Sequence, residues 1–208
     1  MINVTILYEN DEIFVINKPA GLAVQGGAKV SCSIDADFAN QVGQKIFLVH
    51  RLDKDTSGLM IIAKTPAAAS KWTKLIAGKS VCKEYVAVCA GTIFPKKGII
   101  SEIILQHGEE KKAVTHYQVE KEIQTKCGIF TQIRLKLETG RMHQIRIHLA
   151  KNNCPIAGDS QHGNFKLNKI LKKELGIKNL LLVSAKLTIP LDTETKVFEL
   201  SLPDYMCL

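Results

Sequence analysis

The sequence predicts an α+β fold in which a mixed, largely antiparallel β-sheet carries a few packed helices. Runs of strand-like composition follow one another along the chain, and helical patterns interrupt them at only a few places. The 208 residues are 46% hydrophobic and 23% charged, which is ordinary for a globular protein with its own core. We expect residues 1–208 to form a single domain.

The expected strands are short apolar runs bounded by turn residues. They cover residues 4–8, 13–17, 47–49, 59–63, 82–89, 99–105, 113–120, 129–137, 180–185 and 197–200. Turn signals stand at 107–108 and 127–128. The charged segment 109–112 is predicted to be a solvated loop tip.

Four segments are expected to be helical. The strongest signal is at residues 66–77, where Thr65 is a hydroxyl N-cap, Pro66 occupies the first helical position and Gly78 ends the pattern. Residues 32–42 have weak periodicity. A short helix is expected from Arg141 to Ala150, and a lysine-rich amphipathic helix is expected over residues 166–178.

Charge and composition favour a polyanionic partner. The formal charge is +8 and the sequence pI is near 9.2. The first residues lack a basic segment followed by a long apolar one, and no apolar run approaches about 18 residues. We expect a cytoplasmic protein that does not bind membranes.

Cysteines and histidines do not form a metal-binding pattern. The six cysteines have no Cys-x-x-Cys spacing and are expected to be free thiols. His143 and His148 are five positions apart, which is about 140° around a helix that starts near Arg141. They cannot share a metal ion on one helix face, so no metal and no cofactor is predicted.

Residues 50–58, His-Arg-Leu-Asp-Lys-Asp-Thr-Ser-Gly, form a dense polar segment between two apolar runs. The spacing matches the start of a calcium-binding EF-hand loop, but Lys64 stands where a bidentate Glu is required. A kinase catalytic loop is excluded because the Asp falls one place late. A solvated turn with a capping Asp is the simplest alternative.

Arginine usage argues against a simple solvated turn. The chain has 24 lysines and four arginines, and three of the four, Arg51, Arg141 and Arg146, fall within residues 50–58 and 140–148. The planar guanidinium pairs with carboxylate or phosphate in a way that lysine cannot. Asp53 is the nearest carboxylate candidate.

Four ordered motifs resemble those of the RluA-type pseudouridine synthases. Asn17-Lys18-Pro19-Ala20-Gly21 resembles the first family motif. His50-Arg51-Leu52-Asp53 with Thr56-Ser57-Gly58 resembles the signature segment. The third and fourth are Lys83-Glu84-Tyr85 and the segment Gly140–His148. Gly158-Asp159-Ser160-Gln161-His162-Gly163 resembles a further motif, except that His162 stands where Tyr is typical. With the first motif already at Asn17, we expect the short form of the family, without the S4-like RNA-binding domain that often precedes it.

The resemblance implies a function. The protein would isomerise specific uridines in ribosomal or transfer RNA to pseudouridine, as a monomer. Asp53 would be the catalytic nucleophile, attacking either the sugar or the base, and Arg146 would keep it ionised. Tyr85 would stack on the uracil or help to move its C5 proton. Arg51 would fill the gap left by the flipped-out uridine. The remaining substrate-binding residues would be His50, Thr56, Arg141, His143, Gln144 and Leu181.

Two alternatives from other functional classes remain. A non-catalytic RNA-binding module would keep the fold and the basic charge but would not need Asp53. A nucleotide hydrolase would use His143, Asp53 and a metal ion, although no ligand spacing supports it.

Overall fold

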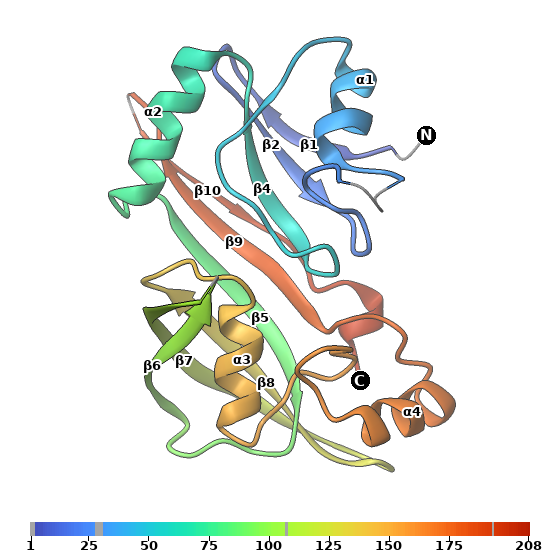
Figure 1. Cartoon of the computed structure of the whole chain (residues 1–208). Coiled ribbons are helices and arrows are strands. Elements are labelled where there is room, and N and C mark those ends of the chain that lie inside the picture. Colours follow the sequence, from blue (N-terminus) through green and yellow to red (C-terminus); the bar gives the residue numbers. More distant parts are fainter. Residues whose placement is uncertain (1–2, 28–30, 107, 193) are drawn as a thin grey trace. The chain divides into compact units, whose positions relative to one another are not determined.

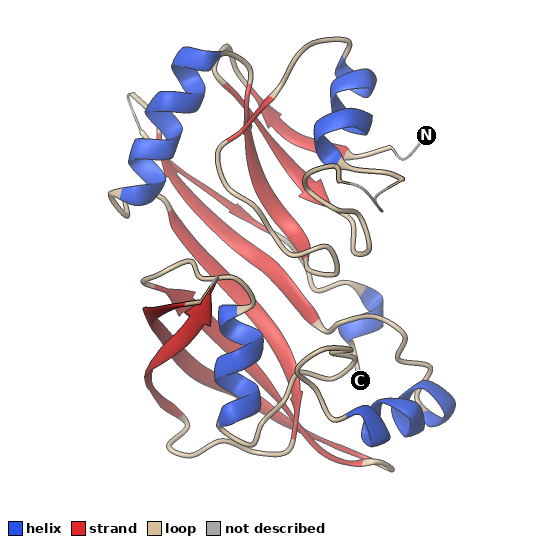
Figure 2. Ribbon diagram, viewed as in Figure 1, coloured by secondary structure: helices blue, strands red, loops and turns tan. Residues whose placement is uncertain are grey.

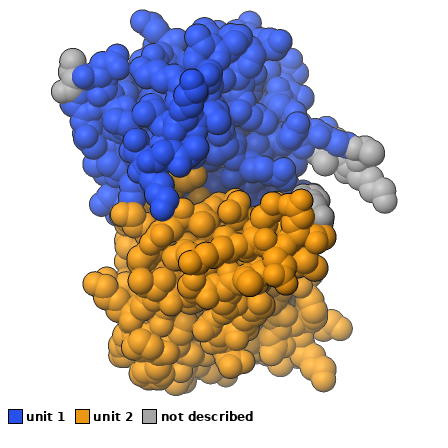
Figure 3. All heavy atoms as spheres, turned by 60° about the vertical axis from the view of Figure 1, so that its left-hand side comes forward, with its two compact units in different colours: residues 1–82, 184–200 blue, residues 83–183, 201–208 orange. Residues whose placement is uncertain are grey.

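The computed structural model describes residues 3–27, 31–106, 108–192 and 194–208 (Figure 1). Antiparallel strand pairs with a few helices packed on them confirm the predicted α+β class (Figure 2). The chain divides into two compact units: residues 1–82 with 184–200 form unit 1, and residues 83–183 with 201–208 form unit 2 (Figure 3). That the whole chain folds as a single domain stays a prediction.

The strands of unit 1 follow the order β1-β2-β4-β9, with β3 paired to β4 and β10 paired to β9. Their bounds are Thr5–Glu9 (β1), Ile13–Lys18 (β2), Phe47–Leu48 (β3), Ser57–Ala63 (β4), Leu182–Pro190 (β9) and Thr195–Glu199 (β10). Every residue of β4 is buried, as expected for a strand covered on both faces.

Helix α2 (Pro66–Ala77) covers one face of this sheet, with the cap and bounds that the sequence predicted. Its Trp72 is 1% exposed and packs among alternate residues of β2 and β4. The indole N–H donates to Glu12 Oε2 over 2.9 Å. Burying one such large side chain contributes roughly 1.5–3 kcal/mol, so this layer holds unit 1 together.

The other face of β2 is covered by the segment predicted to be a weak helix. It begins as a π-helical turn, Ile34–Phe38, and continues as one turn of α-helix, α1 (Ala39–Val42). Phe38 is fully buried, and its ring meets Phe14 of β2 edge-on with centroids 5.3 Å apart. The expected helix is therefore confirmed in place but not in its regular geometry.

Unit 2 is built on four antiparallel strands in the order β5-β8-β7-β6. Their bounds are Cys82–Ala90 (β5), Lys97–Gln106 (β6), Glu109–Thr125 (β7) and Gly128–Leu137 (β8). The prediction of a loop tip at 109–112 was wrong: these residues extend β7, and Glu109 pairs with Gln106. Charged side chains fit there because this end of the hairpin is largely exposed. Of the expected turn at 107–108, residue 107 lies outside the described residues.

Two helices belong to unit 2. Helix α3 (Gln144–Lys151) packs on β6 and β7. Helix α4 (Phe165–Glu174) ends four residues before the predicted position, because Gly176 takes a left-handed conformation with φ of 68°. No helix within the described ranges has both the length and the apolar character needed to cross a lipid bilayer.

Candidate active site

The segment that contains Asp53 lies between β3 and β4, as expected. Ser57 and Gly58 already belong to β4, so the loop is shorter than the predicted polar segment. Leu52 and Thr56 are buried and anchor it, and the Thr56 N–H donates to the Asp53 carbonyl over 3.1 Å. Asp53 itself is half-buried. Its carboxylate is therefore carried by a tight turn with buried anchors.

His50 fastens the start of this loop to β4. Its Nε2 accepts the Ile61 backbone N–H over 2.9 Å. In a neutral imidazole an accepting Nε2 places the proton on Nδ1. Arg51 is exposed. The roles of His50, Arg51 and Thr56 in substrate binding stay predictions.

Lys18, in the first motif, holds the loop from β2. The residue is fully buried, and its ammonium donates to the carbonyl oxygens of Pro19, Leu22 and Lys54 at 2.9, 2.8 and 2.9 Å. An ammonium has three N–H donors, so this arrangement uses all of them. Because Lys54 directly follows Asp53, Lys18 fixes the backbone beside the candidate nucleophile.

The charge of Lys18 is maintained against the cost of burial. Burial lowers the pKa of Lys18 from 10.5 to about 8, and the carboxylates of Asp55 and Asp53 act in the opposite direction. The first motif was recognisable in the sequence, but the role of Lys18 within it was not predicted. The one available signal was that this lysine ends an apolar strand, Ile13–Lys18.

Gly58 is required by the approach of two backbones. It has φ of +109°, and a Cβ at this position would lie 2.3 Å from the Ser184 carbonyl oxygen on β9. Any side chain would therefore push β4 away from β9. This accounts for the glycine that ends the signature segment.

Tyr85 and Leu181 are buried in unit 2. Tyr85 lies on β5 opposite Leu135 of β8. The Leu181 N–H donates to the Ala157 carbonyl, and the Leu181 carbonyl accepts the Val88 N–H, both over 3.0 Å. Leu181 thus joins two backbone segments of unit 2, and its contact with substrate stays a prediction.

The helix predicted from Arg141 begins only at Gln144. His143 has φ of 54°, a left-handed conformation that interrupts the helical path before α3. Arg141 therefore lies in the loop, where its Nε donates to the Lys112 carbonyl over 3.3 Å. The expected start of the helix at Arg141 was wrong for this reason.

Gln144 organises the turn that leads into α3. Its Oε1 accepts from the Thr139 hydroxyl over 2.7 Å and from the Arg141 N–H over 3.1 Å. Its Nε2 donates to the Val114 carbonyl over 3.0 Å and to the Thr115 hydroxyl over 2.9 Å. The side chain is buried, and these four bonds are internal. They establish a structural role, and direct substrate binding by Gln144 stays a prediction.

Arg146 forms a buried, bidentate ion pair with Asp159. Its Nε and Nη2 donate to the two carboxylate oxygens over 2.8 and 2.7 Å, and the side chains are 3% and 1% exposed. Burial by itself would raise the pKa of Asp159. Hydrogen bonds from Arg146 and from the backbone N–H groups of His162 and Gln161 outweigh it and hold that pKa below 3.8.

The sequence around Asp159 is shaped to hold this carboxylate. A Cβ at Gly158 would lie 2.0 Å from the Asn179 carbonyl oxygen, and a Cβ at Gly163 would lie 2.4 Å from the Asp159 carbonyl oxygen. Asn168 of α4 donates to that same Asp159 oxygen over 2.7 Å and accepts the Gly158 N–H over 3.1 Å. The resemblance of residues 158–163 to a family motif was predicted from the sequence, but the role of Asp159 was not.

His162, the departure from the family pattern, contacts a predicted site residue. His143 Nδ1 and His162 Nε2 are 2.9 Å apart, and the rings meet edge-on with centroids 5.1 Å apart. One imidazole must donate and the other must accept. His162 therefore orients the ring of His143.

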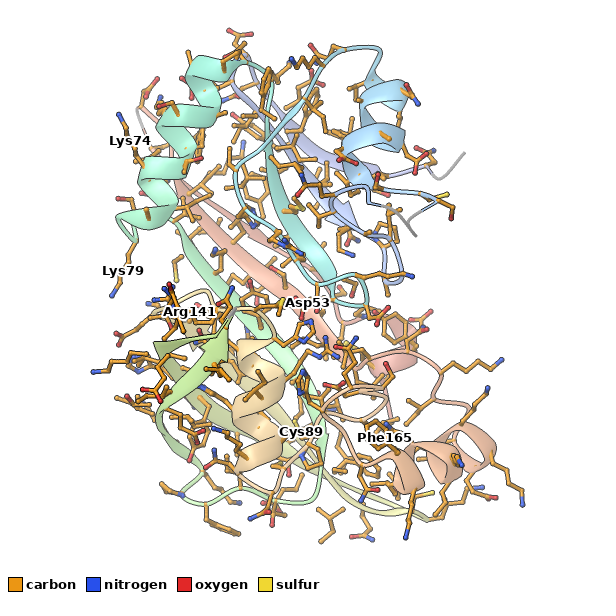
Figure 4. The ribbon with its side chains drawn as sticks, viewed as in Figure 1. Asp53, Lys74, Lys79, Cys89, Arg141 and Phe165 are labelled. Atoms are coloured by element: carbon orange, nitrogen blue, oxygen red, sulfur yellow. The ribbon has the colours of Figure 1, made fainter. Side chains whose placement is uncertain are left out.

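The predicted site residues divide between the two units. His50, Arg51, Asp53 and Thr56 belong to unit 1, where Figure 4 labels Asp53. The others, Tyr85, Arg141, His143, Gln144, Arg146 and Leu181, belong to unit 2. Within unit 2, Arg141, His143, Gln144 and Arg146 lie on one short segment at the start of α3.

No group of three His, Cys, Asp or Glu side chains among the described residues could hold a metal ion. All six cysteines are free, as predicted, and Cys89 and Cys154 are buried.

Residues 12–151 match the model of a family described as RNA pseudouridylate synthase. This match covers more than half of the sequence. The chain belongs to this family. The resemblance that the four motifs indicated is thereby confirmed.

Curated relatives and solved structures agree with this assignment. Ribosomal large subunit pseudouridine synthase C of Rickettsia bellii is 38% identical over 195 residues, covering 87% of this chain and 64% of the relative. Ribosomal large subunit pseudouridine synthase D of Haemophilus influenzae is 37% identical over 178 residues, covering 78% and 53%. The chain thus spans between about half and two thirds of their length. The structure titled Human RNA Pseudouridylate Synthase Domain Containing 4 has a TM-score of 0.77 and 26% identity, covering 97% of this chain and 90% of that one.

Proposed function

We propose that this protein is an RNA pseudouridine synthase, an isomerase that acts without a cofactor or metal ion. Family membership over residues 12–151 is the observation that carries the proposal. The two curated relatives are named as ribosomal large subunit pseudouridine synthases, so large-subunit ribosomal RNA is the first substrate to test and transfer RNA the second. The protein would act as a monomer in the cytoplasm.

The reaction breaks one bond and forms another at the same sugar carbon. The glycosidic bond from C1′ to N1 breaks, the uracil turns while it is held, and C1′ joins C5. The C5 proton leaves to solvent and N1 gains a proton, so there is no net oxidation. Because a base inside a helix is inaccessible, the uridine would be flipped out of the RNA first.

Asp53 would be the nucleophile, which attacks the sugar or the base and is released again when C1′ joins C5. Its loop supports this role, because the turn is anchored by Leu52 and Thr56 and its backbone is bonded to Lys18. A nucleophile on a rigid support loses little freedom when the substrate arrives. Tyr85 would contact the uracil, and Arg51 would fill the gap in the RNA.

Arg146 would keep the nucleophile ionised, a role taken from the family resemblance. The ion pair with Asp159 supports it, because two of the five N–H donors of the guanidinium fix its orientation. A fork held in this way can serve a second acceptor at the same time. We propose that this acceptor is the carboxylate of Asp53.

Tritium release tests the proposal. Transcripts of large-subunit ribosomal RNA carrying 5-tritiated uridine are incubated with excess enzyme, and the released tritium is counted over time. We expect Asp53→Asn to lower the single-turnover rate by at least about a thousandfold, as for other catalytic carboxylates. Asp55→Asn, two residues away on the same loop, is the matched control and should stay within about tenfold of wild type. An Asp53→Asn protein as fast as wild type would exclude Asp53 as the nucleophile, whereas a wild-type protein that binds the transcript but releases no tritium would favour a non-catalytic RNA-binding module.

A further inference from the structure

The outward face of α4 combines cationic and large apolar side chains. Phe165 and Ile170 are 56% and 50% exposed. The same helix exposes four lysines: Lys166, Lys169, Lys172 and Lys173. At 100° per residue these six side chains fall on one broad arc, which we call the α4 face. Glu174, the acidic residue of α4, lies outside this arc; it bonds Lys126 over 3.0 Å, and its carboxylate also lies 3.9 Å from the Lys173 ammonium.

The α4 face is electrostatically unfavourable for an isolated protein. Lys169 stands three positions from Lys166 and Lys172 and four from Lys173, and like charges at these spacings destabilise a helix. Lys166 lies in the first turn, where the helix dipole disfavours a cation. Within the described part of the chain, no carboxylate pairs with Lys166, Lys169 or Lys172. An anionic partner would relieve this repulsion.

The helix that carries this face is firmly attached to unit 2. Asn164 caps its first turn by accepting the Leu167 N–H over 3.0 Å, and Leu171 is fully buried beneath it. Asn168, also on the inner side, bonds Gly158 and Asp159. The exposed side chains therefore stand on a fixed support next to the residue that orients Arg146, and Phe165 projects at the start of the helix (Figure 4).

We infer that the α4 face binds RNA outside the reacting nucleotide. Lysines of this face would contact phosphates, and Phe165 would stack on an unpaired base. An anionic membrane is the weaker match, because the apolar side of α4 faces the protein and only two apolar side chains point outward. The inference rests on the proposed function for the identity of the polyanion.

RNA binding by variants in which three lysines are replaced by uncharged glutamines tests the inference. The variant Lys166→Gln/Lys169→Gln/Lys173→Gln is compared with Lys45→Gln/Lys97→Gln/Lys121→Gln, which removes the same charge from exposed positions outside α4. Filter binding measures the affinity for a transcript of large-subunit ribosomal RNA between 50 and 200 mM salt. Three lost phosphate contacts should reduce the slope of log affinity against log salt by about 2 to 3. The control variant should lose less than half of that.

Phe165→Ala separates stacking from charge. We expect affinity for the same transcript to fall about tenfold with an unchanged salt slope, since one base loses its aromatic platform. The single-turnover rate at saturating RNA should stay within about twofold of wild type for every α4 variant. Far-UV circular dichroism and the thermal midpoint establish that each variant is folded.

The outcomes separate this inference from the proposed function. A wild-type protein that binds the transcript through α4 but releases no tritium would disprove the activity and keep the inference. Equal losses of affinity in the two triple variants would overturn the inference, because net charge alone would explain them. Unchanged RNA affinity of the α4 triple variant would overturn it too, whether or not that variant loses binding to phosphatidylglycerol vesicles.

Discussion

Single side chains position the backbone and each other in both units, and three of them, Lys18, Arg146 and Asp159, are buried charges. Lys18 donates hydrogen bonds to three carbonyl oxygens, and Asp159 accepts two hydrogen bonds from Arg146. Buried charges of this kind are tolerated only when hydrogen-bonded. Removing or neutralising one of these charges should therefore have a larger effect than the same change at a solvent-exposed position.

Activity should fall as the pH rises above about 8. Lys18 then loses its proton, and a neutral amine has two N–H donors for three carbonyls, so the Asp53 loop loosens. The tritium-release rate is measured from pH 6.5 to 9.5 at saturating RNA. A rate that stays flat to pH 9.5 would contradict this role of Lys18.

Unfolding does not explain such a loss. The folded-state pKa of Lys18, about 8, is below the ordinary value of 10.5, so between these pH values the unfolded chain binds more protons. Stability from this group therefore rises with pH over that window. Circular dichroism at pH 9.5 should show the same fold as at pH 7.

Asp159→Asn should destabilise the protein by about 3–5 kcal/mol, because it leaves the buried Arg146 guanidinium without its ionic partner. Urea unfolding at pH 7 measures this. Because the pKa of Asp159 is held below 3.8, its contribution is present above pH 3.8 and is lost as the pH falls through the lower folded-state value. Asp192→Asn removes a carboxylate that is 88% exposed and should change stability by less than about 0.5 kcal/mol.

At the scale of elements, local sequence signals decided which predictions succeeded. Helix α2 was exact at both ends because Thr65, Pro66 and Gly78 act within one turn of their own position. The predicted start of α3 was wrong because His143 adopts a left-handed conformation, which the neighbouring sequence does not indicate. Residues 109–112 were misread because charge suggested a loop, while pairing with β6 made them a strand.

Gly58→Ala should destabilise unit 1 by about 3 kcal/mol or more. The new Cβ would meet the Ser184 carbonyl oxygen at 2.3 Å and would also sit on a backbone with positive φ. Gly43→Ala is the matched control, because Gly43 also has positive φ, 64°, but has no atom within 4 Å of the added carbon. It should cost only about 1 kcal/mol. Equal losses in urea unfolding would show that the β4–β9 approach is not the cause.

For the whole molecule, the sequence predicted the fold class, the family and the positions of most strands along the chain. It did so because apolar periodicity and motif spacing are properties of the chain itself. It could not predict that Lys18 reaches Lys54, or that Asn168 reaches Asp159, since these contacts depend on tertiary structure. The sequence therefore provided candidate site residues, whose roles stay predictions, but not the buried contacts that hold the segments around them.

The net charge of +8 makes a prediction about binding as a whole. RNA affinity should fall at least tenfold between 50 and 200 mM salt, because bound lysines displace condensed counterions. Filter binding with the ribosomal transcript measures it. Affinity that does not change with salt would contradict an electrostatic mode of binding.

Trp72 is the one tryptophan of the sequence, and it extends from α2 into the core of unit 1, where it packs among residues of β2 and β4 and donates its indole N–H to Glu12. Tryptophan emission, excited where tyrosine absorbs little, is therefore an optical probe of unit 1, whereas far-ultraviolet circular dichroism reports the secondary structure of both units. If the chain is a single cooperative body, the two signals should report one melting curve. Two separated curves would identify each unit as an independent folding block.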